Sequence, residues 1–305
     1  MFRRWLTGIS AVFFVIVVLA FAYVSLFKGQ TDLRQQAQLK TAIIDQLSGT
    51  HPNRTFWCTA RTVFNESGYE IYYFMGGADT IDFYRTLPER DFKVIILRLH
   101  SAIHLESGDL AIFTSEGWDD GRASTTYLAD ILNDGLAKVS IDVDSPEYFG
   151  ITPNFVRAMR GNLNTFIIMM GCQELIGASM AEVFIQKGAE AYIGWTGPVE
   201  AGHTDAATLR LLQHLISERH TISQTVSETL NEVGEDPYYG SSLNYFPLNV
   251  GDLTISQIQS ISNRVSTIMS PLRLDWFSAV LIVNGFMSGV NSVRRHNEAL
   301  WARLE

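Results

Sequence analysis

The sequence predicts an α/β protein in which helices cover both faces of a mostly parallel sheet, with a membrane segment before it. Three observations support this prediction. Short, continuous apolar runs alternate with stretches of helical spacing, which is typical of strands buried on both faces. Residues 5–27 carry no charge. Two of the apolar runs end at residues with reactive side chains, one at His100 and the other at Cys172.

The composition limits the classes of partner and cofactor. The chain has 305 residues, of which 47% are hydrophobic, enough for one large domain or two modest ones. A net charge of −9, with no dense stripe of Lys and Arg, argues against nucleic acid as a partner. The two cysteines, Cys58 and Cys172, allow one disulfide at most and lack the CxxC spacing of thiolate zinc sites. We expect no metal and no organic cofactor.

The N-terminal segment, residues 1–30, is predicted to be a transmembrane anchor. The uncharged run is long enough to cross a bilayer. Arg3 and Arg4 precede it, so the positive-inside rule places Met1 in the cytoplasm and the main domain outside. A cleaved signal peptide is the alternative, because Ala20-Phe21-Ala22 has the small-x-small pattern of a cleavage site. Both alternatives export the domain.

Residues 31–250 are predicted to form the α/β domain. Its strands are short apolar runs that stop at glycine or at a polar residue such as Asp45. The predicted strands are residues 41–44, 69–74, 94–99, 110–114, 166–170 and 191–195. The predicted helices, which have helical apolar spacing between these runs, are residues 55–66, 80–87, 124–133, 155–159, 175–187, 205–219 and 222–233. Asp205 is expected to cap the helix that it begins.

Residues 251–305 are predicted to be a C-terminal helical region. Residues 253–269 have helical spacing, and the uncharged residues 276–293 form a probable second transmembrane helix. Asp275 precedes this segment and Arg294-Arg295 follow it, which again obeys the positive-inside rule. A core helix packed on the sheet is the alternative.

The thiol and the imidazole suggest nucleophilic chemistry. The carboxyl ends of parallel strands meet at one edge of a sheet, so His100 and Cys172 are expected to meet if their strands are neighbours. A thiol at the start of a helix has a lowered pKa and forms thiolate more readily. For Cys58, beside Phe56 and Trp57, we expect a core position. A metal site at His100 and His104, with Glu106, is a minor alternative because the two histidines would share a face only on a helix.

At these residues the chain resembles the caspase-like cysteine peptidases, the clan of caspases, legumains, clostripain and gingipains. The resemblance covers residues 40–233. It rests on the strand ending at His100, the strand ending at Gly171-Cys172 and the run of residues 188–195. In particular, the chain is similar to archaeal, gingipain-like membrane proteins of unassigned activity.

The resemblance implies a three-layer α/β/α sandwich and a role for each matching residue. His100 would be the general acid/base and Cys172 the nucleophile. The backbone N–H groups of Cys172 and Ser101 would stabilise the oxyanion. Two features depart from the clan: Ser101 stands where glycine is usual, and the long interval between His100 and Cys172 requires an insertion.

The resemblance also suggests a substrate pocket. The loop after the first strand often helps to line it, so Asp45 would favour a basic residue before the scissile bond, although a surface or capping carboxylate fits the sequence equally well. Glu116 and Trp195 are further candidates for the pocket. The resulting hypothesis is a membrane-embedded cysteine endopeptidase, a hydrolase that acts on peptide or protein substrates outside the cytoplasm. Two alternatives are an inactive caspase-like module that binds a partner at the outer cell surface, and a metal-dependent hydrolase.

Overall fold

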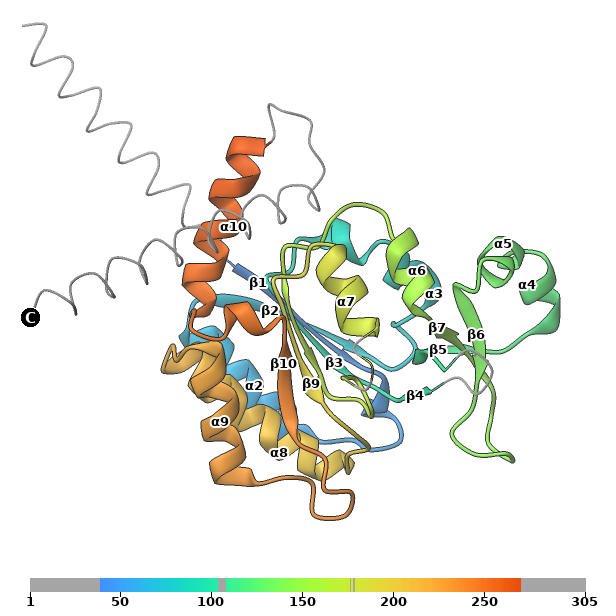
Figure 1. Ribbon diagram of the computed structural model, residues 1–305. Coiled ribbons are helices and arrows are strands. Elements are labelled where there is room, and N and C mark those ends of the chain that lie inside the picture. Colours follow the sequence, from blue (N-terminus) through green and yellow to red (C-terminus); the bar gives the residue numbers. More distant parts are fainter. Residues whose placement is uncertain (1–38, 104–107, 176, 178, 270–305) are drawn as a thin grey trace, which may run out of the picture. The chain divides into compact units, whose positions relative to one another are not determined.

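The computed structural model describes residues 39–103, 108–175, 177 and 179–269, and it shows an α/β fold with a mixed, mostly parallel sheet (Figure 1). The strand order is β10-β9-β8-β3-β1-β2. β1 pairs with β3, β3 with β8 and β8 with β9 in parallel, whereas β10 runs antiparallel to β9. The strands are β1 (Leu39–Asp45), β2 (Tyr69–Met75), β3 (Val94–Arg98), β8 (Phe166–Met169), β9 (Ala191–Trp195) and β10 (Leu243–Phe246).

Helices cover both faces of this sheet (Figure 1). Because side chains alternate along a strand, neighbouring residues serve opposite faces. Leu97 packs in one core cluster with residues of the first set of helices, whereas Arg98 points to the other face and stacks over Phe56. The first set is α3 (Ile81–Arg85), α6 (Pro153–Ala158) and α7 (Ser179–Gln186). The second set is α2 (Arg54–Glu66), α8 (Ala201–Leu212) and α9 (Ile222–Val233).

A second, antiparallel sheet is inserted between β3 and β8, in the order β4-β5-β7-β6. Its strands are β4 (Ser101–Ile103), β5 (Leu110–Gly117), β6 (Leu136–Val139) and β7 (Tyr148–Ile151). Phe113 and Val139 pack together on one of its faces. This sheet, with the short helices α4 (Asp120–Ser124) and α5 (Leu128–Leu132), accounts for the long interval between His100 and Cys172.

The remaining described elements are short turns and one helix. They are η1 (Gln46–Ser48), η2 (Leu87–Arg90), the π-helical turn η3 (Gln213–Ser217), η4 (Leu248–Val250) and α10 (Ile255–Met269). Local sequence signals set several helix starts. Asn53 accepts a hydrogen bond from the Phe56 N–H at the start of α2, and Thr221 forms a capping box with Gln224 at the start of α9.

Several predicted boundaries were wrong. The helix expected from residue 175 begins at Ser179, and residues 124–133 form parts of α4 and α5 instead of one helix. The cap of α8 is Glu200, which accepts a hydrogen bond from the His203 N–H, so Asp205 lies inside the helix. Cys58 is exposed on α2 and both cysteines are free, which corrects the expected core position.

The membrane predictions fall mainly outside the described residues. Both proposed spans, residues 1–30 and 276–293, lie entirely outside them. Among the described residues, no helix combines the length and the apolar character needed to cross a bilayer. The two spans therefore stay predictions.

A buried ion network joins the sheet to α8. The Arg98 guanidinium donates to Asp45 Oδ1 at 2.7 Å, to both oxygens of Asp205 at 2.7 and 2.9 Å, and to the His51 carbonyl at 2.8 Å. Asn53 donates to Asp205 Oδ2 at 2.8 Å. Burial opposes the charge on Arg98, but the two carboxylates outweigh it and raise the pKa of the guanidinium. The guanidinium therefore stays charged inside the fold.

Replacing Arg98 with methionine is expected to lower the free energy of unfolding by roughly 3–5 kcal/mol, because two buried carboxylates would lose their cation. Urea denaturation measures this change. The matched control is Lys138→Met, which breaks a half-exposed ion pair to Glu147 and is expected to cost less than about 1 kcal/mol. Equal effects in the two variants would contradict a special role for Arg98.

Candidate active site

The ends of β3 and β8 bring His100 and Cys172 to the same edge of the sheet. These strands are parallel neighbours, with Leu97 opposite Met169. Counting the same number of residues beyond this pair reaches His100 on one strand and Cys172 on the other. The Ser101 hydroxyl donates to the Cys172 carbonyl at 2.8 Å, so the two chain segments still adjoin beyond the strands.

The main chain of His100 is held on both sides. Its N–H donates to Gln46 Oε1 at 2.8 Å, and its carbonyl accepts from the Phe113 N–H at 3.0 Å. The other end of the Gln46 amide donates to the Thr114 carbonyl at 3.0 Å. One side chain at the end of β1 thus links β3 to the inserted sheet, and it fixes the backbone from which the imidazole projects.

The His100 imidazole lies in a partly buried, largely aromatic setting. Its ring makes edge contacts with the rings of His51 and Phe113, with centroids 6.2 and 6.0 Å apart. Burial, and to a smaller extent the charge of His51, lower the pKa of His100 below 6.5. At neutral pH the imidazole is therefore mainly uncharged and able to accept a proton.

Cys172 lies in a tight turn after β8. An added Cβ on Gly171 would lie 2.4 Å from Ser101 Oγ and 2.7 Å from Glu174 Oε1, so only glycine fits there. Gln173 has a φ of 63°, in the left-handed region. The Gln173 and Leu175 N–H groups donate to the carbonyls of Gly197 and Trp195 at 2.9 and 3.1 Å. The turn is thus bound to the segment that follows β9.

The Cys172 thiol is not activated by a helix, which corrects the sequence argument. It is half-buried, it donates to the Val199 carbonyl at 3.7 Å, and α7 begins only at Ser179. Burial raises the pKa of the thiol above 9.0; the Val199 contact opposes this, and nearby Glu174 and Asp236 add to it. Within the described residues, no hydrogen bond joins its sulfur to the His100 ring. The resting pair is therefore a neutral thiol near a neutral imidazole.

The two predicted oxyanion donors, the backbone N–H groups of Ser101 and Cys172, take no part in the hydrogen bonds of the sheets. Because the Phe113 N–H donates to the His100 carbonyl, Ser101 and Ile112 form a non-hydrogen-bonded pair. In such a pair the Ser101 N–H points away from β5. The Cys172 N–H makes no hydrogen bond to the part of the chain that the structure describes. Among the described residues, neither predicted oxyanion donor therefore has a backbone partner.

A buried carboxyl group lies against the turn that contains Gly171 and Cys172. Glu174 is almost fully buried and accepts a hydrogen bond from the Tyr192 hydroxyl at 2.6 Å. Burial raises the pKa of Glu174 to about 7, although Ser101 and Tyr192 lower it in part. Sequence reasoning missed this residue. Its one signal was a carboxylate two residues after Cys172, between strands that are otherwise apolar.

Asp45 and Trp195 do not line an open site. Asp45 is 1% exposed, and its carboxylate accepts from Arg98 at 2.7 Å and from the Tyr73 hydroxyl at 2.6 Å. Trp195 is also 1% exposed, and its indole N–H donates to Thr204 Oγ1 at 2.9 Å. Both side chains lie between the sheet and the helices, where a substrate would not reach them. The Asp45 carboxylate is therefore not accessible to a substrate, which corrects the expectation that it selects basic residues.

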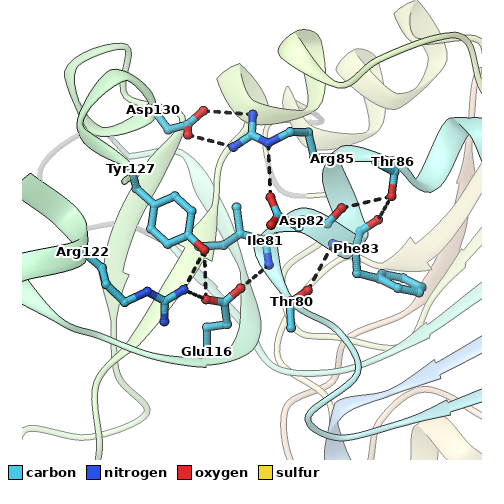
Figure 2. A network of polar contacts seen from close by, with 10 residues as sticks. All are labelled: Thr80, Ile81, Asp82, Phe83, Arg85, Thr86, Glu116, Arg122, Tyr127 and Asp130. Atoms are coloured by element: carbon cyan, nitrogen blue, oxygen red, sulfur yellow. Dashed lines mark hydrogen bonds and ion pairs between the residues drawn. The ribbon is translucent and has the colours of Figure 1, made fainter. Parts of the chain in front are cut away.

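Glu116 belongs to a separate polar network (Figure 2). One carboxylate oxygen accepts from the Ile81 N–H at 2.7 Å, and the other contacts Arg122 and the Tyr127 hydroxyl. These contacts join the start of α3 to β5 and to the α4–α5 segment. Glu116, a candidate for the substrate pocket, thus holds the inserted sheet against the main domain instead.

A loop that sequence reasoning also missed approaches Cys172 from the β9 side. Asp236 accepts the backbone N–H groups of Glu200, Tyr238 and Tyr239 at 2.8, 2.9 and 2.8 Å. Glu200 directly follows Val199, the contact of the thiol. The Tyr238 and Tyr239 side chains are 79% and 61% exposed. Two exposed aromatic rings therefore stand on a loop anchored beside the candidate nucleophile.

The chain matches no known protein-family model, and no curated protein matches its sequence. Neither comparison therefore assigns an activity to the chain.

The buried Glu174 predicts a pH dependence of stability. Its pKa is about 7 in the folded state and near 4.5 when unfolded, so the folded state holds the proton more tightly. The associated stability is present below pH 4.5 and is lost as the pH rises through 7, by roughly 3 kcal/mol in total. Denaturation between pH 5 and 8 is expected to show this loss.

Glu174→Gln is expected to reduce the slope of that part of the pH profile, because the amide does not titrate and can still accept from Tyr192. Buried Glu190 and Asp79, whose pKa values are raised to about 7 and about 6, account for the slope that remains. The matched control is Glu182→Gln, on the exposed side of α7, which should keep the wild-type slope. A Glu174→Gln variant with an unchanged slope would show that another group causes the pH dependence.

Proposed function

We propose that this chain is a cysteine peptidase of the caspase-like type, in which Cys172 is the nucleophile and His100 the general acid/base. One observation carries the proposal: the two residues follow adjacent parallel strands, and the Ser101 hydroxyl joins the segments at 2.8 Å. The clan resemblance implies the same pair of residues. Helices on both faces of the sheet and the antiparallel insertion are compatible with the three-layer sandwich that the resemblance implies.

The reaction would proceed in two halves. His100 takes the Cys172 proton as the sulfur attacks the scissile carbonyl, and the N–H groups of Cys172 and Ser101 stabilise the oxyanion. The C–N bond then breaks, the leaving amine takes the proton from His100, and a thioester remains. Water, deprotonated by His100, attacks the thioester and releases the carboxylic acid product together with the free thiol.

The protonation states suit general-base catalysis rather than a preformed thiolate. The pKa of Cys172 is raised and that of His100 is lowered, so an ion pair is disfavoured at rest. Proton transfer would then accompany attack, and substrate binding would have to bring the imidazole and the thiol into contact. We further propose that Tyr238 and Tyr239 contact the bound peptide, since their loop is anchored beside Val199.

A non-enzymatic module that binds a partner is the second candidate. It is favoured by the same resting state: a protonated thiol donating to the Val199 carbonyl, without a hydrogen bond to His100 among the described residues. An exposed aromatic loop would serve partner binding as well as substrate binding. Reactivity of the thiol toward a peptide-based probe distinguishes the two candidates.

Labelling by a thiol-reactive peptide probe is expected to be lost in Cys172→Ala and kept in Cys58→Ser, because Cys172, and not Cys58, follows the strand adjacent to that of His100. His100→Asn is expected to slow labelling by roughly 10²–10⁴-fold, the range for loss of a general base. Labelling of the wild type should rise with pH up to a pKa above 9.0. Mass spectrometry of the labelled chain measures all three.

Labelling of the wild type no faster than that of Cys172→Ala would reject the peptidase and favour the binding module. Equal rates for the wild type and His100→Asn would remove His100 from the mechanism while leaving Cys172 reactive.

We also propose that residues 1–30 anchor the chain in a membrane, with the α/β domain outside the cytoplasm, and that residues 276–293 span a second time. Arginines on the same side of both apolar runs support this topology. In sealed right-side-out vesicles, external protease should digest the domain and spare tags at both termini. Loss of a C-terminal tag alone would mean that residues 276–293 do not span. A mature chain that begins after Ala22 would instead establish a signal peptide.

A further inference from the structure

We propose that a cluster of histidine and glutamate residues between α8 and α9 binds a divalent transition-metal ion such as Zn²⁺. The His–Glu cluster consists of His214, Glu218, His220 and Glu228, whose ligand atoms all lie within 4.8 Å of one another. Glu232 flanks it. The proposal is independent of the peptidase assignment and uses none of its residues.

The distances among the candidate ligand atoms are those of a site that needs little adjustment; His220 offers either ring nitrogen, of which a single ion would bind one. His214 Nδ1 lies 2.8 Å from Glu218 Oε2 and 3.6 Å from Glu228 Oε2. His220 Nε2 lies 3.6 Å from Glu218 Oε2, and His220 Nδ1 lies 2.7 Å from Glu228 Oε2. Tetrahedral zinc with bonds of 2.0–2.2 Å separates its ligand atoms by about 3.4 Å. The observed separations fall on both sides of that value.

The hydrogen bonding of His214 gives an independent reason to expect a cation. His214 is 6% exposed, and its Nδ1 is paired with Glu218. Its buried Nε2 makes no hydrogen bond among the described residues, yet it lies 3.3 Å from Glu232 Oε1. A metal on Nδ1 would leave the proton on Nε2, facing that carboxylate. A carboxylate behind a metal-bound histidine is the usual arrangement that fixes the tautomer of such a ligand.

The charge balance points the same way. Three carboxylates, from Glu218, Glu228 and Glu232, surround two imidazoles whose rings are stacked with centroids 5.5 Å apart. Arg210 offsets one of the carboxylates, that of Glu232, at 3.2 Å. A divalent ion would neutralise the other two. Two imidazoles with two carboxylates form a ligand set typical of Zn²⁺ and neighbouring transition metals rather than of Mg²⁺ or Ca²⁺.

The backbone around the cluster is arranged to bring the four ligands together. His214 lies in the π-helical turn η3, an irregularity often found at functional sites. The His220 N–H donates to the His214 carbonyl at 3.0 Å, which folds the connection back over η3. Glu228 and Glu232 are one turn apart on α9. A bound metal would therefore clamp the end of α8 to α9, about 18 Å along α8 from its start beside the candidate active site.

Zinc binding to the full-length chain tests the proposal. The parent protein carries Cys58→Ser and Cys172→Ala, so that no thiol competes for the metal. After removal of metal with a chelator, Zn²⁺ titration by calorimetry, with metal analysis by mass spectrometry, is expected to give one ion per chain. Zn²⁺ should also raise the melting temperature of the parent, because it binds the folded state.

Glu228→Gln and His220→Asn are each expected to weaken Zn²⁺ binding at least tenfold and to abolish the rise in melting temperature. The matched control is Glu235→Gln, an exposed carboxylate just beyond α9, which should bind as the parent does. Glu228 is half-exposed, so its variant decides the matter if His220→Asn fails to fold. No stoichiometric uptake by the parent, or parent-like affinity in Glu228→Gln, would overturn the proposal.

Discussion

The buried contact of Arg98 with Asp45 and Asp205 organises the half of the molecule that faces α8. Taking three charges out of water is costly, and the cost is recovered only when every group is paired with good geometry. The network meets that condition, because the guanidinium makes four hydrogen bonds at 2.7–2.9 Å. It joins β1, β3, α8 and the loop before α2. A shift of β1, β3 or α8 would separate a buried charge from its partner.

This network also bears on the candidate active site. Arg98 is the last residue of β3 and precedes His100 by two residues, while Asp45 directly precedes Gln46, whose side chain holds the His100 N–H. The ends of the two strands are therefore fixed relative to each other by an ion pair on one side and an amide on the other. The imidazole therefore projects from a residue whose N–H and carbonyl are both hydrogen-bonded.

The sequence predicted the central strands and several helices well, because their signals are local. The apolar runs of β1, β2, β3, β8 and β9 all appear near their predicted places, as do the helices α2 and α9. Strands β4, β6, β7 and β10 were missed, since they are short and their pairing depends on partners distant in sequence. Residues 175–178 resemble a helix in composition, but Gly177 has a φ of 68° and the turn after Cys172 delays α7.

The site was predictable only as far as strand direction determines it. Parallel register was enough to place His100 and Cys172 after the ends of adjacent strands. The partners of Asp45, Asp205 and Glu174 were not predictable, because the decisive contacts join residues far apart along the chain. Arg98 and Asp205, for example, are separated by 107 positions. The sequence does not distinguish a polar residue at a strand end that faces a substrate from one that contacts a buried partner.

The contacts that hold His100 and Cys172 in place involve their backbone far more than their reactive side chains. The described contacts fix His100 through its N–H and carbonyl, and Cys172 through its carbonyl and the residues that follow it. The imidazole makes only edge contacts with neighbouring rings, and the thiol makes one weak hydrogen bond. Either reactive side chain could therefore be replaced during evolution, or restored, while the fold around it is kept.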